Sequence, residues 1–210
     1  AAVAGRAVGD VGDGVCVGLP VPGVVVRVSP LDAEGRAEGD LTDAPGVVGE
    51  ICVSAPHVKD RYDRLWATER DASRTPGWHR SGDVGHLDAE GRLWVGGRLA
   101  HVVVTADGVI TPVGVEHRVE ELPQVRAAAV VGVGPRGAQA LVVVVETSEG
   151  AGPGPADVGL TQAVRAVAGV PVAAVLTTSA LPVDTRHNSK VDRTAVAAWA
   201  ERVLAGRGAR

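Results

Sequence analysis

The sequence predicts a mixed fold, with a β-rich first part followed by a small α/β part. Up to Arg98, short apolar runs alternate with Gly, Pro and Asp, which is typical of strands joined by turns. After Arg98, continuous apolar runs alternate with segments of helical spacing, as in α/β structures. The chain has no Phe, no Met, one Tyr and four Trp. Its core must therefore be built from Val, Ala and Leu, which favours strands and small-residue helices.

The first part contains several short strand candidates separated by turn residues. They are Val15–Val17, Gly23–Val28, Val47–Val53, Asp83–Leu87 and Arg92–Val95. One hexapeptide, Leu-Asp-Ala-Glu-Gly-Arg, occurs at residues 31–36 and again at 87–92. Because Gly readily adopts a positive φ, we expect the same hairpin turn at both places.

The second part predicts a hairpin, a helix, two strands, a helix, a strand, a loop and a final helix. Asp107-Gly108 is a strong hairpin signal between two short strands, and Pro112 is well placed to open a helix. The expected elements are His101–Thr105, Val109–Thr111, helix Pro112–Glu121, strands Ala127–Val133 and Ala140–Val145, helix Leu160–Ala168, strand Val172–Leu176, and a helix capped by Asp192.

Composition excludes several classes of protein. The net charge is -4 and the basic residues are dispersed, so a nucleic-acid surface is not expected. No apolar run reaches the roughly 18 residues of a membrane helix. Cys16 and Cys52 lie in strand-like runs without a signal peptide, which indicates free thiols in a reducing compartment. We therefore expect a cytoplasmic protein without a membrane span.

Three familiar site motifs are also unsupported. Residues 132–137 match G-x-G-x-x-G, but a strand follows where a dinucleotide site needs a helix, and Pro135 removes a donor. The six His and two Cys lack metal-ligand spacing, so no metal site is predicted. The G-x-S-x-G nucleophile elbow is absent.

Three residues remain as candidates for chemistry. Of the 21 basic residues only Lys59 and Lys190 are lysines. Lys190, just before the final predicted helix, is the first candidate, because the compact ammonium of a lysine suits a phosphate contact. Asp83 follows Gly82 directly before a predicted strand, where one carboxylate can accept hydrogen bonds from a diol. Arg98 follows a Gly pair between the two parts, where a hinge with a phosphate or ribose contact is one interpretation. Taken alone, Asp83 is better explained as a turn residue and Arg98 as a solvated linker residue.

The order of these segments resembles the C-terminal portion of the adenylate-forming superfamily, from about Gly14 to about Leu204. The resemblance is carried by residues 46–51, 78–83, 97–98, Pro112 with Glu116, and 188–193. It implies a β-rich, distorted-barrel subdomain over residues 1–97, a hinge at 98–100 and a small mobile α/β lid domain over 101–210. We expect the chain to be part of a longer enzyme, and the isolated 210 residues to be inactive.

The resemblance also implies roles for the three candidates. Asp83 and Arg98 would contact the ribose of ATP or AMP, and Lys190 would be the catalytic lysine between the α-phosphate and the substrate carboxylate. The cofactors implied are ATP and Mg²⁺, whose ligands would lie mostly outside this chain. The hinge position usually held by Asp is Ala100, and residues 105–110 differ from the segment that helps thioester formation in CoA ligases. Both departures weigh against CoA transfer.

Within the superfamily, residues 78–85 and 181–190 are most similar to the β-lactone synthetases of bacterial long-chain olefin biosynthesis. That similarity implies a 3-hydroxy fatty acid substrate, closure of a β-lactone without CoA, and a complex with other olefin-pathway enzymes. Two alternatives stay open at this point. One is a fatty acyl-CoA ligase or another AMP-binding synthetase, and the other is a non-catalytic module in which Lys190→Ala changes nothing.

Overall fold

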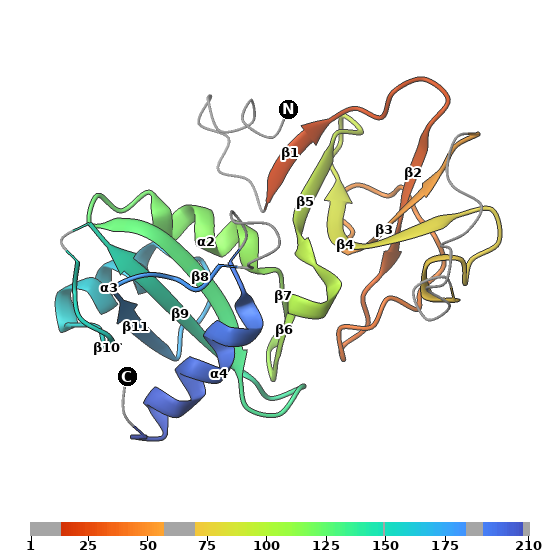
Figure 1. Cartoon of the computed structure of the whole chain (residues 1–210). Helices are drawn as coiled ribbons and strands as arrows, with labels where there is room; N and C mark the ends of the chain where they lie inside the picture. Colours follow the sequence, from red (N-terminus) through yellow and green to blue (C-terminus); the bar gives the residue numbers. More distant parts are fainter. Residues whose placement is uncertain (1–13, 57–69, 149, 184–190, 208–210) are drawn as a thin grey trace. The chain divides into compact units, whose positions relative to one another are not determined.

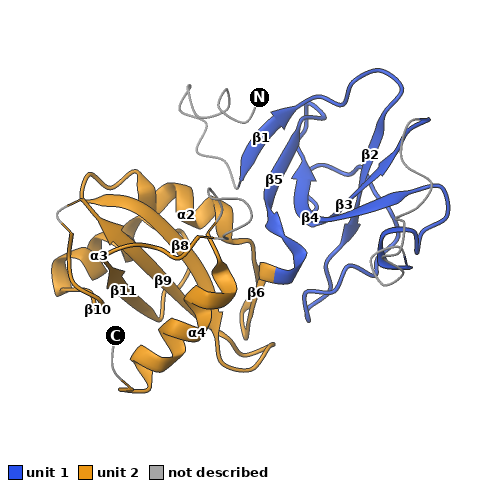
Figure 2. Cartoon of the chain, in the orientation of Figure 1, with its two compact units in different colours: residues 1–100 blue, residues 101–210 orange. Residues whose placement is uncertain are grey.

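The computed structural model describes residues 14–56, 70–148, 150–183 and 191–207. The chain divides into two compact units, residues 1–100 and residues 101–210 (Figure 2). Unit 1 is built mainly from strands, whereas unit 2 combines a sheet with helices (Figure 1). The predicted change from a β-rich first part to an α/β second part is therefore confirmed.

Unit 1 is based on one five-stranded sheet in the order β1-β5-β4-β3-β2 (Figure 1). Every neighbouring pair is antiparallel. The strands are β1 (Val15–Gly18), β2 (Val25–Pro30), β3 (Gly49–Ser54), β4 (His79–Leu87) and β5 (Leu93–Arg98). All five strand candidates of the first part are present, because short apolar runs between turn residues bury one side of such a sheet.

The start of β4 corrects one prediction. The sequence placed the start of this strand at Asp83, but β4 begins at His79 and Asp83 lies inside it. The segment His79-Arg80-Ser81-Gly82 is polar and ends in Gly, which is typical of a turn. In the structure Arg80 is buried nonetheless, because it forms an ion pair with Glu50 of β3. A pairing between distant residues leaves no mark in a local hydrophobic pattern.

The repeated hexapeptide forms the same turn twice, as predicted. In the first copy, Asp32 Oδ1 accepts the backbone N–H of Glu34 at 2.9 Å and of Arg36 at 2.8 Å, and Oδ2 accepts Arg36 Nε. The second copy has the equivalent three bonds from Asp88 to Glu90 and Arg92. The glycine of each copy has a φ near +70°, at +71° and +77°. An aspartate that satisfies two backbone donors and an arginine thus defines each turn.

The described residues of unit 2 form a four-stranded sheet in the order β10-β11-β9-β8, a separate hairpin and three α-helices. β9 is parallel to β11, and the other two pairs are antiparallel. The elements are the 3₁₀ helix η2 (Leu99–His101), which begins in unit 1, then β6 (Val103–Thr105), β7 (Gly108–Ile110), α2 (Pro112–Glu120), β8 (Val125–Val133), β9 (Ala140–Thr147), β10 (Gly154–Pro155), α3 (Val158–Val167), β11 (Ala174–Thr178) and α4 (Arg193–Leu204).

Both faces of this sheet are covered, which explains the continuous apolar runs. Successive residues of a strand point to opposite faces. Val130 and Val143 therefore belong to the core with α2 and α3, whereas Val131 and Val142 belong to the core with α4. The predicted buried strands are confirmed. The short β10 was not predicted, because Gly154 and Pro155 are typical of loops.

The β6–β7 hairpin is present, although its turn differs from the prediction. Thr105 pairs with Gly108, so the two central turn residues are Ala106 and Asp107 and not Asp107-Gly108. The Thr105 hydroxyl donates to the Gly108 carbonyl at 3.0 Å and accepts the N–H of Asp107 at 3.2 Å. Gly108 is the first residue of β7 and has a φ of +137°. The side chain of Thr105 has thus moved the turn by one residue.

The G-x-G-x-x-G segment connects β8 to β9, as expected of a strand-to-strand turn. No helix starts there, so a pyrophosphate would not meet a helix N-terminus. The segment instead contacts β6, since the N–H groups of Gly137 and Gln139 both donate to the Val104 carbonyl at 3.1 Å. Gln139 Oε1 accepts the Val104 N–H in return at 2.8 Å. The glycines serve this packing, and the predicted strand-to-strand turn is confirmed.

Asp88 gives a test of the turn chemistry. Burial by itself raises the pKa of the Asp88 carboxyl, but hydrogen bonds from Trp94 Nε1 and from the backbone and side chain of Arg92 lower it to about 2. Because folding lowers the pKa of this carboxyl, its ionised form stabilises the fold at pH values above 3.8, the pKa of an unperturbed aspartate. This stabilisation is lost as the pH falls towards 2.

We predict that Asp88→Asn lowers the free energy of unfolding at pH 7, and that the difference from wild type shrinks between about pH 4 and about pH 2. Urea unfolding of the 210-residue chain at a series of pH values measures this difference. Asp40→Asn, at an exposed position, is the control for loss of one negative charge. A difference that stays constant over the whole pH range would contradict the proposed charge dependence.

Candidate functional site

Two of the predicted site residues lie opposite each other in unit 1. Asp83 of β4 and Arg98 at the end of β5 form a cross-strand pair in the sheet. Arg98 Nε lies 3.1 Å from Asp83 Oδ1, and the two side chains are 54% and 36% exposed for Arg98 and Asp83. The structure therefore brings together a carboxylate and a guanidinium, both accessible to a solute, from residues 15 positions apart in the sequence.

Asp83 is carried by a bulge in β4. Between the pairs Cys52–Arg80 and Glu50–Val84, β4 has three residues where β3 has one. Gly82 in the middle of this bulge has a φ of +73°, which costs little for glycine and more for other residues. The Asp83 N–H donates to Ser81 Oγ at 3.0 Å, and Arg98 also donates to the Ser81 carbonyl at 3.4 Å. The bulge displaces Asp83 from the regular ladder with β3. A separate register shift, between Val84 and Gly85 in the pairing of β4 with β5, brings Asp83 opposite Arg98.

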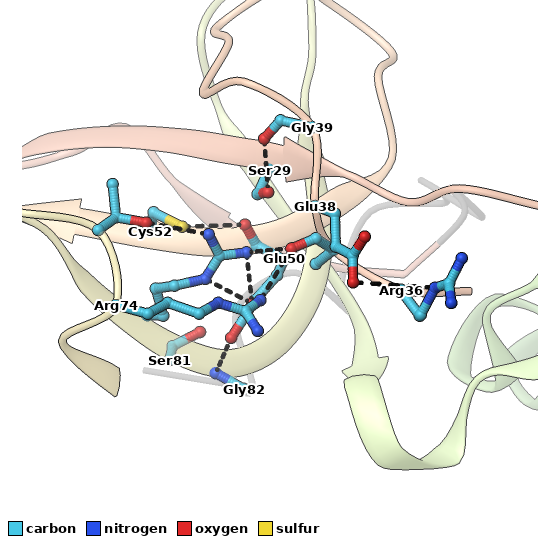
Figure 3. Close-up of polar contacts among 12 residues, drawn as sticks. Ser29, Arg36, Glu38, Gly39, Glu50, Cys52, Arg74, Ser81 and Gly82 are labelled. Carbon is cyan, nitrogen blue, oxygen red and sulfur yellow. Dashed lines mark hydrogen bonds and ion pairs between the residues drawn. The ribbon is translucent and has the colours of Figure 1, made fainter. Parts of the chain in front are cut away.

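A buried carboxylate supports this bulge from β3. Glu50, with a side chain only 5% exposed, accepts the Gly82 N–H on Oε1 at 3.1 Å. Its other oxygen, Oε2, accepts Arg80 Nε at 2.8 Å and Arg74 Nη2 at 2.9 Å (Figure 3). Both arginines also donate to the Ala37 carbonyl. One glutamate thus joins two arginines to the backbone of the segment that carries Asp83.

This cluster was not predicted from the sequence. Glu50 was used only as part of the Gly49-Glu50-Ile51 segment at the start of a strand. The available signal was a Glu directly before Ile51 and Cys52, both of which are buried in the structure. A charged residue inside an apolar strand indicates a buried ion pair, but the pattern does not name its partners. Arg74 and Arg80 lie between two predicted strands, where no element was assigned.

The other two predicted site residues give less. Ala100 lies in the short η2 helix, and its role as a hinge stays a prediction. Lys190 lies outside the described residues, so its contacts are not part of the description. The flanking residues are described: Val183 and Val191 form an antiparallel bridge, and Asp192 N–H donates to the Pro182 carbonyl at 2.8 Å. Both ends of segment 184–190 therefore lie at one place in unit 2.

A second buried glutamate fixes the C-terminal side of that segment. Glu116 of α2 accepts the Val130 N–H at 2.8 Å and Arg193 Nε at 3.0 Å on Oε1, while Oε2 accepts Arg193 Nη2. Arg193 is the first residue of α4, and the Asp192 side chain caps this helix by accepting the Ala195 N–H. The start of α4 is thereby bound to α2 and, through Glu116, to β8.

The accessible pair has a definite chemical capacity. A carboxylate can accept hydrogen bonds from two hydroxyl groups, and a guanidinium can donate several in a fixed plane. Asp83 and Arg98 together suit a polar ligand that has hydroxyl groups next to acceptor atoms. Within the described ranges, no group of three or more His, Cys, Asp or Glu side chains is arranged to hold a metal ion.

Comparisons with known proteins define the class. The amide bond synthetase McbA from Marinactinospora thermotolerans superposes with a TM-score of 0.70 and 32% identity, over 88% of this chain and 35% of that one. An indoleacetate–CoA ligase from Aromatoleum aromaticum is 39% identical over 108 residues, covering 50% of this chain and 21% of the ligase. No family model matches the chain. In sequence and fold the chain matches the C-terminal portion of adenylate-forming enzymes.

A longer match points to one branch of this family. The chain is 39% identical to the olefin beta-lactone synthetase of Xanthomonas campestris pv. campestris over 210 residues. This match covers 93% of the chain and 38% of the synthetase. The chain thus spans less than two fifths of the length of that relative. This sequence identity confirms the resemblance to β-lactone synthetases that was inferred from residues 78–85 and 181–190.

The Glu116–Arg193 pair predicts a large effect on stability. Removing one partner of a buried ion pair leaves the other charge unpaired and typically costs ~3–5 kcal/mol. Because Arg193 keeps 19% of its side chain exposed, we expect Glu116→Gln to lower the free energy of unfolding by about 3 kcal/mol, at the lower end of that range. Urea unfolding followed by far-ultraviolet circular dichroism measures this change.

Glu121→Gln is the matched control, since Glu121 follows the same helix and is exposed. We expect its effect to stay within about 0.5 kcal/mol of wild type. Equal stability of the Glu116→Gln and Glu121→Gln variants would show that the buried pair does not hold α4.

Proposed function

We propose that this chain is part of an enzyme that activates a carboxylic acid with ATP, and that the whole protein is a β-lactone synthetase acting on 3-hydroxy fatty acids in olefin biosynthesis. The observation that carries the proposal is the accessible Asp83–Arg98 pair, in a chain that is 39% identical to an olefin beta-lactone synthetase over 93% of its length. The pair suits a ribose, whose vicinal hydroxyls can donate to one carboxylate.

The first step forms an acyl adenylate. The substrate carboxylate attacks the α-phosphorus of ATP, a new C(O)–O–P bond forms, and pyrophosphate leaves. Lys190 would stabilise the negative charge that builds on the phosphoryl oxygens, a contribution often worth ~10²–10³ in rate. Asp83 and Arg98 would hold the ribose, so that carboxylate, phosphorus and leaving group stay in line.

The second step closes the lactone. The 3-hydroxyl oxygen of the substrate attacks the activated carbonyl carbon, the bond from that carbon to the AMP oxygen breaks, and the hydroxyl proton is released to solvent. The product equals the acid minus one water, and no thiol takes part. Mg²⁺ commonly neutralises nucleotide phosphates, and its ligands would lie mostly outside this chain.

The relationship to an indoleacetate–CoA ligase supports a second candidate, an acyl-CoA ligase. In that case the thiol of CoA attacks the same adenylate. Residues 105–110, which depart from the family pattern for thioester formation, form the β6–β7 hairpin and its turn. The departure at Ala100 and the longer match to the lactone synthetase favour the first candidate.

The remaining expectations concern the setting of the enzyme. We propose a small-molecule fatty acid as substrate, a cytoplasmic location and a complex with other olefin-pathway enzymes. Within the described residues, no helix is long and apolar enough to cross a membrane. Residues 98–100 would act as a hinge between a large-domain portion, residues 1–97, and a mobile lid, residues 101–210.

We predict that Lys190→Ala lowers the rate of pyrophosphate release about 10²–10³-fold, because the transition state loses its preorganised positive charge. The assay uses the protein expressed at the full length of its reading frame, with ATP, Mg²⁺ and a 3-hydroxy fatty acid. Lys59→Ala is the matched control, since it removes the only other lysine of these 210 residues. Wild-type release by Lys190→Ala would favour a non-catalytic role for this chain.

The identity of the product separates the two enzymatic candidates. With the same full-length protein and substrates, we predict a product lighter than the acid by one water, formed without CoA. Mass spectrometry of reactions with and without CoA measures it. A thioester that forms only when CoA is present would assign the protein to the acyl-CoA ligases and would contradict the lactone proposal.

A further inference from the structure

Glu50 divides its two carboxylate oxygens between two different tasks. Oε2 is taken up by the guanidinium groups of Arg80 and Arg74, at 2.8 and 2.9 Å. Oε1 accepts the N–H of Gly82 at 3.1 Å (Figure 3). The first oxygen balances charge inside the unit, and the second holds the backbone one residue before Asp83. Glu50 itself is buried and does not reach the accessible surface of the pair.

The bulge makes the contact to Gly82 necessary. Gly82 lies among the three residues of β4 that face a single residue of β3, so its N–H is outside the regular ladder. A backbone donor that loses its ladder partner needs another acceptor when water is largely excluded. The Glu50 carboxylate supplies this acceptor, and as an ionised group it binds the N–H more strongly than a carbonyl does.

Stability alone does not account for this arrangement. Buried ion pairs contribute little net stability, because the cost of desolvating the charges offsets their attraction, and apolar residues of similar volume often serve as well. An apolar side chain at position 50 would fill the same space but would accept no hydrogen bond from Gly82. The specific consequence of a carboxylate here is the position of the bulge, and hence of Asp83 relative to Arg98.

We propose that Glu50 is a positioning residue for recognition of the nucleotide ribose. By holding the Gly82 N–H, it sets the place of the Asp83 carboxylate, so that this group meets the 2′- and 3′-hydroxyls and not the solvent. The inference rests on the proposed function, since it needs a nucleotide at Asp83. It adds a residue from β3, buried and without ligand contact, to the determinants of nucleotide selectivity.

The test compares ATP with 2′,3′-dideoxy-ATP, which lacks both hydroxyls. For each variant, kcat/KM is measured for both nucleotides from pyrophosphate release by the full-length protein. The value for ATP divided by the value for 2′,3′-dideoxy-ATP reports the hydroxyl contacts, and a general loss of active enzyme cancels in this ratio. Glu50→Asp keeps the charge but is one methylene too short to bind both arginines and Gly82. We expect its ratio to fall about 10- to 100-fold, the loss of a hydrogen bond to a charged group.

Glu50→Gln makes the opposite change. The amide oxygen can still accept the Gly82 N–H, but the two arginines lose their counter-charge. We expect Glu50→Gln to unfold at a lower temperature than wild type and to keep the wild-type ratio, whereas Glu50→Asp loses the ratio with a smaller change in stability. Glu38→Asp, at an exposed position, is the control and leaves both unchanged.

Each outcome decides between the hypotheses. A wild-type protein that forms no adenylate contradicts the proposed function itself. An active wild type whose Glu50→Asp variant keeps the ratio, or whose own ratio is near one, contradicts the positioning role. If neither variant folds, hydrogen exchange of the Gly82 amide in the wild-type 210-residue chain decides: slow exchange supports the contact, and exchange as fast as at exposed Gly23 contradicts it.

Discussion

Each unit depends internally on the same interaction, a buried glutamate that accepts hydrogen bonds from a backbone N–H and from arginine. In unit 1, Glu50 joins Gly82 of β4 to Arg74 and Arg80. In unit 2, Glu116 joins Val130 of β8 to Arg193 of α4. Each carboxylate is at most 7% exposed. The arginine makes the burial of the charge tolerable, and the N–H fixes a strand relative to its neighbour.

The consequence in each unit is a rigid support beside a segment proposed to act in catalysis. Glu50 supports the bulge that carries Asp83, and Glu116 fixes the helix that begins three residues after Lys190. The Asp83–Arg98 pair itself is of a different kind. Because both side chains are more than one third exposed, the pair contributes at most about 1 kcal/mol to stability. Asp83 and Arg98 can therefore give up their contact and bind ligand hydroxyls instead, with little loss of folding stability.

The sequence predicted the elements of the fold well, because apolar periodicity and turn residues are local signals. The alternating burial along β8 and β9, the two Leu-Asp-Ala-Glu-Gly-Arg turns and the Asp192 cap all follow from neighbouring residues. The start of β4 and the position of the β6–β7 turn were wrong. The first depends on the ion pair of Arg80 with a residue 30 positions away, and the second on the hydroxyl of Thr105.

The candidate site was predicted in part for the same reason. Asp83 and Arg98 were named from turn and linker patterns together with a family resemblance, and the sheet register brings them into contact. The cross-strand pairing itself was not predicted, since the register of β4 with β5 shifts between Val84 and Gly85. Glu50 was not identified as a functional residue, because a buried carboxylate has no sequence pattern that names its arginines.

Transfer of an oxygen isotope from the substrate to AMP would show directly whether an acyl adenylate forms. The full-length protein is incubated with ATP and a 3-hydroxy fatty acid labelled with ¹⁸O in its carboxylate, and the AMP is analysed by mass spectrometry. If the carboxylate attacks the α-phosphorus, the bridging oxygen leaves with the nucleotide. We therefore predict AMP that carries one ¹⁸O atom. Unlabelled AMP, or release of ADP in its place, would contradict it.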